Sequence, residues 1–169
     1  MSKLGRNINI IYRNYKNIDC INDLLKLKLF CKKNGNNLYL ANNIKLSIKL
    51  RLNGVYLPSF NNKLNFSGSF SLPKKFKIIG SAHSFKEIKI KKAQGCKEIF
   101  LSPLFKVIKS KKFLGIIKFN FLTLGIKNDF IALGGINEKN FKTLKLINIK
   151  GFATISWAKK NGLRNLGRF

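Results

Sequence analysis

Short apolar segments recur along the chain, each three or four residues long and rich in β-branched or aromatic side chains. Several are apolar at consecutive positions, which is typical of parallel strands that are buried on both faces. We therefore predict seven strands, at Asn9–Tyr12, Leu38–Leu40, Gly54–Leu57, Lys77–Gly80, Glu98–Leu101, Phe130–Leu133 and Phe152–Ile155.

Amphipathic stretches separate some of these segments and predict helices. Ile21–Lys33 sets leucines and a phenylalanine among lysines, and Phe85–Gln94 follows Ser84, an N-cap with Glu87 three residues on. A third helix is predicted over Asn137–Ile147, with its first residue as the cap. The alternation of strands and helices predicts a parallel sheet wrapped by helices.

A barrel and an open doubly wound sheet both satisfy this alternation. The chain lacks a glycine-rich nucleotide-binding loop after the first predicted strand, which disfavours the open nucleotide-binding sheets. Asn61–Lys75 is polar and punctuated by Gly, Ser and Pro, so we predict a loop with at most one short helix there. With no internal repeat, we predict a single domain over residues 1–169.

Composition agrees with a globular protein, since 45% of the 169 residues are hydrophobic and 24% are charged. The three cysteines show no CxxC spacing, so neither a disulfide framework nor a zinc site is indicated. There is no run of 18 apolar residues and no secretory pattern at the amino terminus. We expect a cytoplasmic protein without a membrane partner.

Positive charge is the most unusual feature, with 34 Lys+Arg against 6 Asp+Glu and a net charge of +28. A basic nucleic-acid-associating protein is therefore one alternative. However, 29 of the cations are Lys, and they are spread along the chain. A/T-rich codons would explain this abundance of Lys, Asn and Ile. Nucleic acid is not the partner we expect, but the charge favours anionic ligands in any cleft.

Five motifs in order resemble the thiamine phosphate synthases and the related TenI-type thiazole tautomerases: Ser81–Ser84 (SAHS), Ala93–Cys96 (AQGC), Ile99–Phe105 (IFLSPLF), Ala132–Asn137 (ALGGIN) and Gly151–Ser156 (GFATIS). The resemblance runs from about Ile11 to about Trp157 and implies a (β/α)8 barrel. Ile10–Arg13 resembles the second strand of the family. We therefore expect a barrel that lacks the first βα unit, with about seven parallel strands.

Loops after the last two strands of such barrels commonly bind phosphate. Gly134 and Gly135 follow one of these strands, and glycines let a backbone approach an anion closely. The resemblance places Thr154, Ile155 and Ser156 where the family binds thiazole phosphate. The alternative is that the glycines form only a tight turn and that the second segment is only a core strand.

The resemblance also implies a site for a pyrimidine diphosphate. Arg13 matches a family position that holds this diphosphate. Asn42 and Asn43 stand at the family's Asn-Asp pair, and Asn61 stands at its second Asp position. In the family, aspartates there bind Mg²⁺, which accompanies the pyrophosphate. Because Mg²⁺ prefers carboxylates, we predict no tight Mg²⁺ site formed by the protein alone.

Ser81 matches a family serine at the substrate, so Ser81 and Arg13 are the candidate catalytic residues. His83 matches a histidine with a structural role in the family. Lys109 and Lys111 lie in a lysine-rich loop where synthases contact pyrophosphate. They would either clamp a diphosphate or belong to a solvated run of charge.

The predicted function is thiamine biosynthesis, by joining a pyrimidine diphosphate to a thiazole phosphate with release of pyrophosphate. The resemblance thus implies a transferase that binds a small phosphorylated heterocycle. The missing carboxylates leave open a degenerate phosphate-binding or regulatory barrel without turnover. The sequence also leaves open whether identical chains associate.

Overall fold

The computed structural model describes residues 8–14, 21–64, 72–108, 110 and 112–155. Seven strands form one parallel sheet in the order in which they occur along the chain. All seven predicted strands are confirmed, with bounds that shift by one or two residues. They are β1 (Ile10–Tyr12), β2 (Leu38–Ala41), β3 (Gly54–Leu57), β4 (Lys77–Ala82), β5 (Glu98–Leu101), β6 (Asp129–Leu133) and β7 (Gly151–Ala153).

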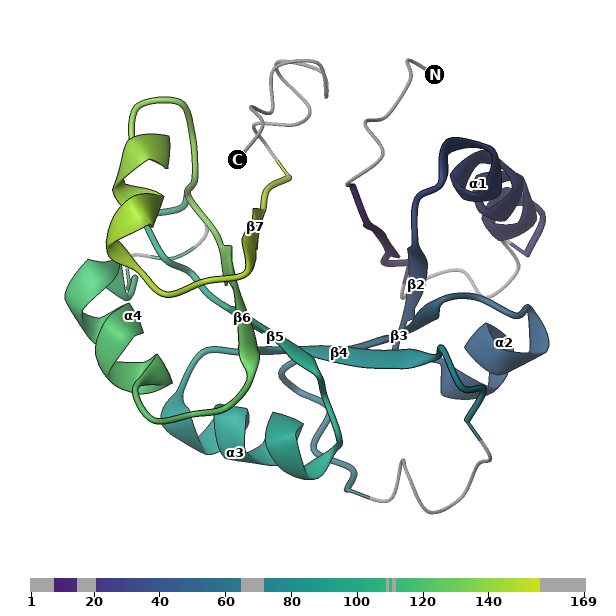
Figure 1. Cartoon of the computed structure of the whole chain (residues 1–169), viewed down its shortest axis with the longest axis horizontal. Coiled ribbons are helices and arrows are strands. Elements are labelled where there is room, and N and C mark those ends of the chain that lie inside the picture. The colour runs from purple at the N-terminus through teal and green to yellow at the C-terminus, as the bar shows by residue number, and fades with distance from the viewer. Residues whose placement is uncertain (1–7, 15–20, 65–71, 109, 111, 156–169) are drawn as a thin grey trace.

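The sheet curls into a half-barrel, and the helices lie along its outer, convex side (Figure 1). Strands β1 and β7 are the two edges of the sheet and flank its open side. This arrangement confirms the predicted barrel with one βα unit missing. Because all strands are parallel, their carboxyl ends gather at one end of the half-barrel, which we call the rim.

The helices are α1 (Ile21–Asn34), α2 (Ile44–Lys49), α3 (Phe85–Ala93), α4 (Gly115–Thr123) and the 3₁₀ helix η1 (Phe141–Leu146). The first two predicted helices correspond to α1 and α3. The predicted helix over Asn137–Ile147 is wrong in extent and type, because the Asn137 Oδ1 accepts hydrogen bonds from the amides of Lys139 and Asn140 at 2.9 and 3.3 Å. This local turn delays the helix to Phe141.

Two layers of apolar side chains hold the sheet, because successive residues of a strand point to opposite faces. Inside the curl, one buried cluster consists of Tyr39, Ala41, Tyr56, Ile79, Phe100 and Ile131. Outside, residues such as Val55, Leu101 and Ala132 pack against the helices. Burial on both faces explains why the strand segments are apolar at consecutive positions.

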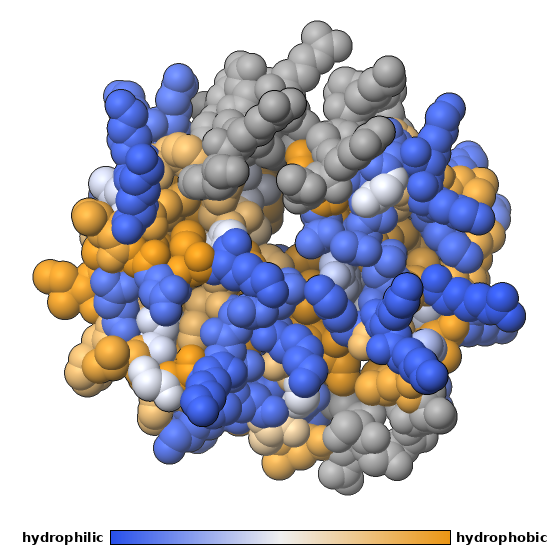
Figure 2. All heavy atoms as spheres, viewed as in Figure 1, coloured by the Kyte–Doolittle hydropathy of each residue, from blue (hydrophilic) through white to orange (hydrophobic). Residues whose placement is uncertain are grey.

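Hydrophilic residues cover much of the face seen in Figure 2, and apolar residues show at its left, where α4 and η1 lie. Exposed apolar side chains there include Ile117, Phe121 and Leu124. Of the helices in the described part of the chain, none has the length and apolar character needed to cross a membrane.

Candidate functional site

The turns after β6 and β7 lie side by side at the rim. Leu133 pairs with Ala153, so Gly134 and Thr154 each follow directly after a pair of neighbouring strand residues. Gly134, Gly135 and Thr154 are half-buried, and Ile155 is 58% exposed. The structure thus brings together four of the residues predicted to bind phosphate and leaves them open to solvent. The fifth, Ser156, lies outside the described residues.

The glycines in the first turn are required by close packing. Gly134 and Gly135 have φ angles of +96° and +71°, and a Cβ on Gly135 would lie 2.7 Å from the backbone of Phe105 and Lys106. The Phe105 amide also donates a hydrogen bond to the Gly134 carbonyl at 3.0 Å. A tight structural turn therefore accounts for both glycines, and phosphate binding by this turn stays a prediction.

Arg13 and Ser81 lie toward the rim on the concave side. Ser81 is 5% exposed and follows the inward-facing Ile79 by two residues, so it belongs to the same face of β4. The Arg13 Cζ lies 5.6 Å from the centre of the Tyr56 ring. That ring packs edge-on against Phe100 with centroids 5.8 Å apart. The concave face of the sheet below the rim is therefore aromatic at Tyr56 and Phe100, and the Arg13 guanidinium lies over Tyr56.

The three asparagines at the family's Asn-Asp pair and second Asp position all use their side-chain oxygens. The Asn61 amide nitrogen donates to the Asn42 Oδ1 at 2.6 Å, and the Asn61 Oδ1 accepts from the Lys63 amide at 3.1 Å. The Asn43 Oδ1 accepts from the Leu46 amide at 3.0 Å and caps α2. These neutral, occupied oxygens do not fit the Mg²⁺ site that the family implies.

Two acidic side chains lie away from the rim, at the amino ends of strands. Glu98 and Asp129, at the amino ends of β5 and β6, pair with Lys77 and Lys150 at 3.5 and 2.6 Å. Burial, followed by the charge of Glu98, raises the pKa of Tyr39 to about 12. No cluster of three or more His, Cys, Asp or Glu that could hold a metal occurs in the described part of the chain.

His83 joins β4 and α3 to the end of β5. Its Nδ1 lies 2.7 Å from the Ser102 carbonyl oxygen and 3.2 Å from the Ser102 hydroxyl. Its amide donates to the Glu87 carboxylate at 2.7 Å, and the Ser84 hydroxyl caps α3 as predicted. These contacts fit the structural role that the resemblance implies for His83.

Lys91 and Gln94 are functional candidates that the sequence analysis missed. Both are 0% exposed, and their side chains bond the loop that follows β3. Lys91 lies three residues after the buried Ile88, which was a signal that it shares the inward-facing side of α3. Gln94 is the C-cap of α3 and gave no such signal. A lysine in an amphipathic helix is ordinarily solvent-exposed, so the signal is easily overlooked.

The loop over residues 106–112 contains an antiparallel bridge between Val107 and Ser110. Lys109 and Lys111 lie outside the described residues. Their predicted contact with pyrophosphate therefore stays a prediction.

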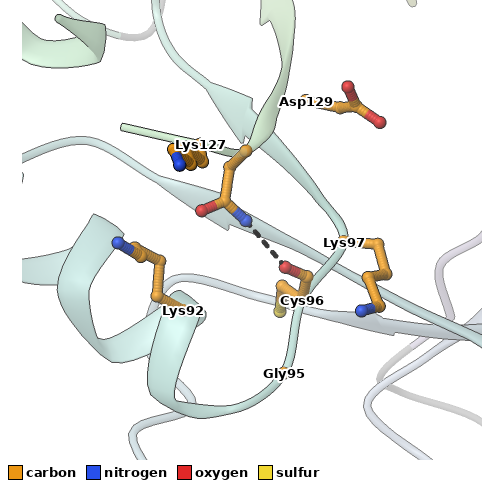
Figure 3. Close-up of a pocket in the computed structure, with 7 residues that line it drawn as sticks. Lys92, Gly95, Cys96, Lys97, Lys127 and Asp129 are labelled. Carbon is orange, nitrogen blue, oxygen red and sulfur yellow. Dashed lines mark hydrogen bonds between the residues drawn. The ribbon is translucent and has the colours of Figure 1, made fainter. Parts of the chain in front are cut away.

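A separate pocket of about 530 Å³ lies at the opposite end of the strands (Figure 3). Lys92, Lys97 and Lys127 line it, and the Asn128 side chain closes one wall by donating to the Cys96 carbonyl at 2.9 Å. Lys97 and Asn128 directly precede β5 and β6, so the pocket is at the amino ends of these strands. Barrel active sites lie at the carboxyl ends, so this pocket is not the candidate site.

The curled parallel sheet, its outer helices and its rim of strand-end turns place the molecule in the (β/α)-barrel class of proteins. A family model described as thiamine monophosphate synthase matches residues 7–158. The chain therefore belongs to the thiamine monophosphate synthase family, which is named for a step of thiamine biosynthesis.

Individual relatives agree with this assignment. Thiamine-phosphate synthases from two strains of Prochlorococcus marinus are 42% identical over 84 residues and 30% identical over 142 residues. These matches cover 47% and 82% of this chain but 24% and 40% of the relatives, so the chain spans less than half the length of either.

Among solved structures, the thiamine phosphate pyrophosphorylase from Pyrococcus furiosus superposes with a TM-score of 0.69 at 15% identity. The match covers 87% of this chain and 70% of that one. A structure described as native KDPGal has a TM-score of 0.58 at 9% identity, with coverages of 87% and 68%. At these identities, both matches support the barrel fold.

Proposed function

We propose that the chain joins a pyrimidine diphosphate to a thiazole phosphate and releases pyrophosphate, as a thiamine phosphate synthase does. Family membership supports this reaction class. The observation that carries the proposal is the pairing of Leu133 with Ala153, which sets the Gly134–Gly135 turn beside Thr154. The proposed ligand of these turns is the phosphate of the thiazole.

The pyrimidine diphosphate is proposed to lie on the other side of the rim. The bond between the pyrimidine methylene and the diphosphate oxygen breaks, and its electron pair leaves with pyrophosphate. The thiazole nitrogen then forms a new bond to the methylene carbon. Arg13 and Ser81 would stabilise the charge on the departing pyrophosphate by donating to its oxygens, while Tyr56 offers the pyrimidine an aromatic surface.

A phosphate-binding or regulatory barrel without turnover is the second candidate function. The occupied amide oxygens of Asn43 and Asn61 favour it, because they cannot replace the family's Mg²⁺-binding carboxylates. Such a protein would still bind a small phosphorylated heterocycle.

The two functions are separated by incubating the purified chain with both phosphorylated precursors and Mg²⁺, and measuring thiamine phosphate and pyrophosphate. The synthase proposal expects both products in equal amounts, at a rate that falls in Ser81→Ala. Retained binding of thiazole phosphate without product would support the second function. Absence of binding of either precursor would contradict both.

A further inference from the structure

A buried ammonium group holds the loop after β3 from the convex side of the sheet. The Lys91 Nζ donates to the Pro58 carbonyl at 2.8 Å, the Asn61 carbonyl at 2.7 Å and the Gln94 Oε1 at 2.9 Å. An ammonium group has three N–H donors, and all three are used here. Burial lowers the pKa of Lys91, and the three acceptors stabilise its ammonium form.

Gly80 and Gln94 complete this clamp. A Cβ on Gly80 would lie 2.8 Å from the Lys91 Cδ, so glycine gives the lysine stem room to cross β4. The Gln94 Nε2 donates to the carbonyls of Asn61 and Lys63 at 2.9 and 2.8 Å. Two fully buried side chains thus fix the backbone that carries Asn61.

The fixed loop determines whether the Oδ1 or the Nδ2 atom of Asn42 faces Asn61. Because the Lys63 amide donates to the Asn61 Oδ1, the Asn61 Nδ2 is the atom that faces Asn42. The atom of Asn42 that accepts this hydrogen bond must then be its Oδ1. The exposed Asn42 consequently presents its amide N–H groups to solvent at the rim, with no partner among the described residues.

Arg13 adds positive charge to the same part of the rim. Tyr12 pairs with Leu40, so Arg13 aligns with Ala41, the residue before Asn42. Its guanidinium lies over Tyr56, which pairs with Ala41 from the other side. Amide N–H groups and a guanidinium bind phosphate oxygens, whereas Mg²⁺ requires oxygen ligands.

We infer that Lys91 and Gln94 are positioning residues that aim the Asn42 amide at a diphosphate, and that this part of the rim binds the anion without a divalent cation. The identity of the natural ligand, a pyrimidine diphosphate, rests on the proposed function. The anion chemistry rests on the contacts above and is tested with inorganic pyrophosphate.

Calorimetric titration of the full chain with pyrophosphate, in EDTA and then in Mg²⁺, tests the metal dependence. Binding is expected in EDTA and is not expected to strengthen in Mg²⁺. Asn42→Asp, which has nearly the same shape, replaces donors with a negative charge and should weaken binding in EDTA by about tenfold or more. Part of that loss should be recovered when Mg²⁺ is added.

The positioning role is tested with Lys91→Met and Gln94→Glu. Gln94→Glu keeps an acceptor for Lys91 but removes both N–H donors to the loop. It still tests the positioning role if Lys91→Met does not fold. Each should weaken pyrophosphate binding by about tenfold, speed amide exchange in residues 59–64 and leave thiazole phosphate binding unchanged. Lys92→Met, at an exposed neighbour that lines the other pocket, is the matched control and should change none of these.

The inference would be overturned if pyrophosphate binding required Mg²⁺, or if both positioning variants bound pyrophosphate with wild-type affinity. It would also be overturned if Lys92→Met alone lost affinity. A complete absence of pyrophosphate binding would overturn it as well. Failure to form thiamine phosphate would overturn the proposed synthase activity but not this inference, because its readout is binding of the anion.

Discussion

The two sides of the rim are built in different ways. Beside β6 and β7, the candidate phosphate site consists of backbone turns, in which Gly134 packs against Pro103 and Gly135 against the backbone of Phe105 and Lys106. Beside β1 to β3, the candidate diphosphate site consists of side chains, including Arg13, Asn42 and Asn61. Substitution of a few residues can change the ligand chemistry of the second side, whereas the first side depends on main-chain geometry.

This difference is compatible with a chain that has only 6 acidic residues, keeps the family's fold and carries Asn43 and Asn61 where the resemblance implies metal-binding carboxylates. Amides can replace carboxylates on the side-chain face of the rim without disturbing the strands. On the backbone face, an added Cβ would collide with a neighbouring loop. Changes on the β6–β7 side should therefore cost stability, and changes on the β1–β3 side should cost binding.

The largest effect is expected for Gly135→Ala, compared with Gly125→Ala. Both glycines have a φ of +71°, but a Cβ meets backbone atoms at 2.7 Å only at Gly135, while Gly125 has nothing within 4 Å. Gly125→Ala should lower the free energy of unfolding by about 1 kcal/mol, and Gly135→Ala by about 3 kcal/mol or more. Urea denaturation measures both, and equal losses would contradict the close packing.

On the other side, Arg13→Gln should weaken pyrophosphate binding by about 10- to 100-fold, because it removes charge-assisted hydrogen bonds. Its control is Arg51→Gln, at an exposed arginine after α2 and before the amino end of β3. Calorimetric titration should show wild-type affinity in this control. Equal weakening by the two substitutions would indicate that only the overall charge of the protein matters.

Ser81→Ala should slow formation of thiamine phosphate by about tenfold or more, with little change in stability, because no hydrogen bond of its hydroxyl occurs within the described residues. Ser47→Ala provides the opposite pattern. The Ser47 hydroxyl donates to the Asn43 carbonyl at 2.8 Å, so its removal should cost about 1 kcal/mol of stability and leave the rate intact. A rate loss in both variants would argue against a specific role for Ser81.

The smallest effect concerns pH. Because burial lowers the pKa of Lys91 below the ordinary value of 10.5, the unfolded chain holds more protons than the folded one as pH rises toward that value. The penalty for the buried charge is therefore full at neutral pH and declines as pH increases through the folded pKa. Relative to Lys91→Met, the wild-type protein should gain stability between pH 7 and 10.5 in denaturant titrations, and a loss would contradict this sign.

The sequence predicted the sheet well, because the seven strands are short apolar runs buried on both faces. It missed α2, which has only six residues, and α4, whose exposed Ile117 and Phe121 obscure the amphipathic pattern. It also placed a longer helix where the side chain of Asn137 forms a turn.

At the site, the adjacency of Gly134 and Thr154 followed from parallel strand order. The bond between Asn42 and Asn61 did not, since it joins two loops separated by 19 positions. Lys91 was hidden for a different reason. Among the chain's 29 lysines, nothing in the composition marks Lys91 as fully buried, and only its spacing from Ile88 indicates it.

The most direct test of the two-sided rim is a pair of nuclear magnetic resonance titrations of the labelled chain in EDTA, one with pyrophosphate and one with thiazole phosphate. We expect pyrophosphate to shift the Asn42 side-chain amide and the Arg13 guanidinium, and thiazole phosphate to shift the amides of Gly134, Gly135 and Thr154. The account would be contradicted if both ligands shifted the same set of residues. It would also be contradicted if the shifts occurred at the opposite end of the strands, around Lys92, Lys97 and Lys127.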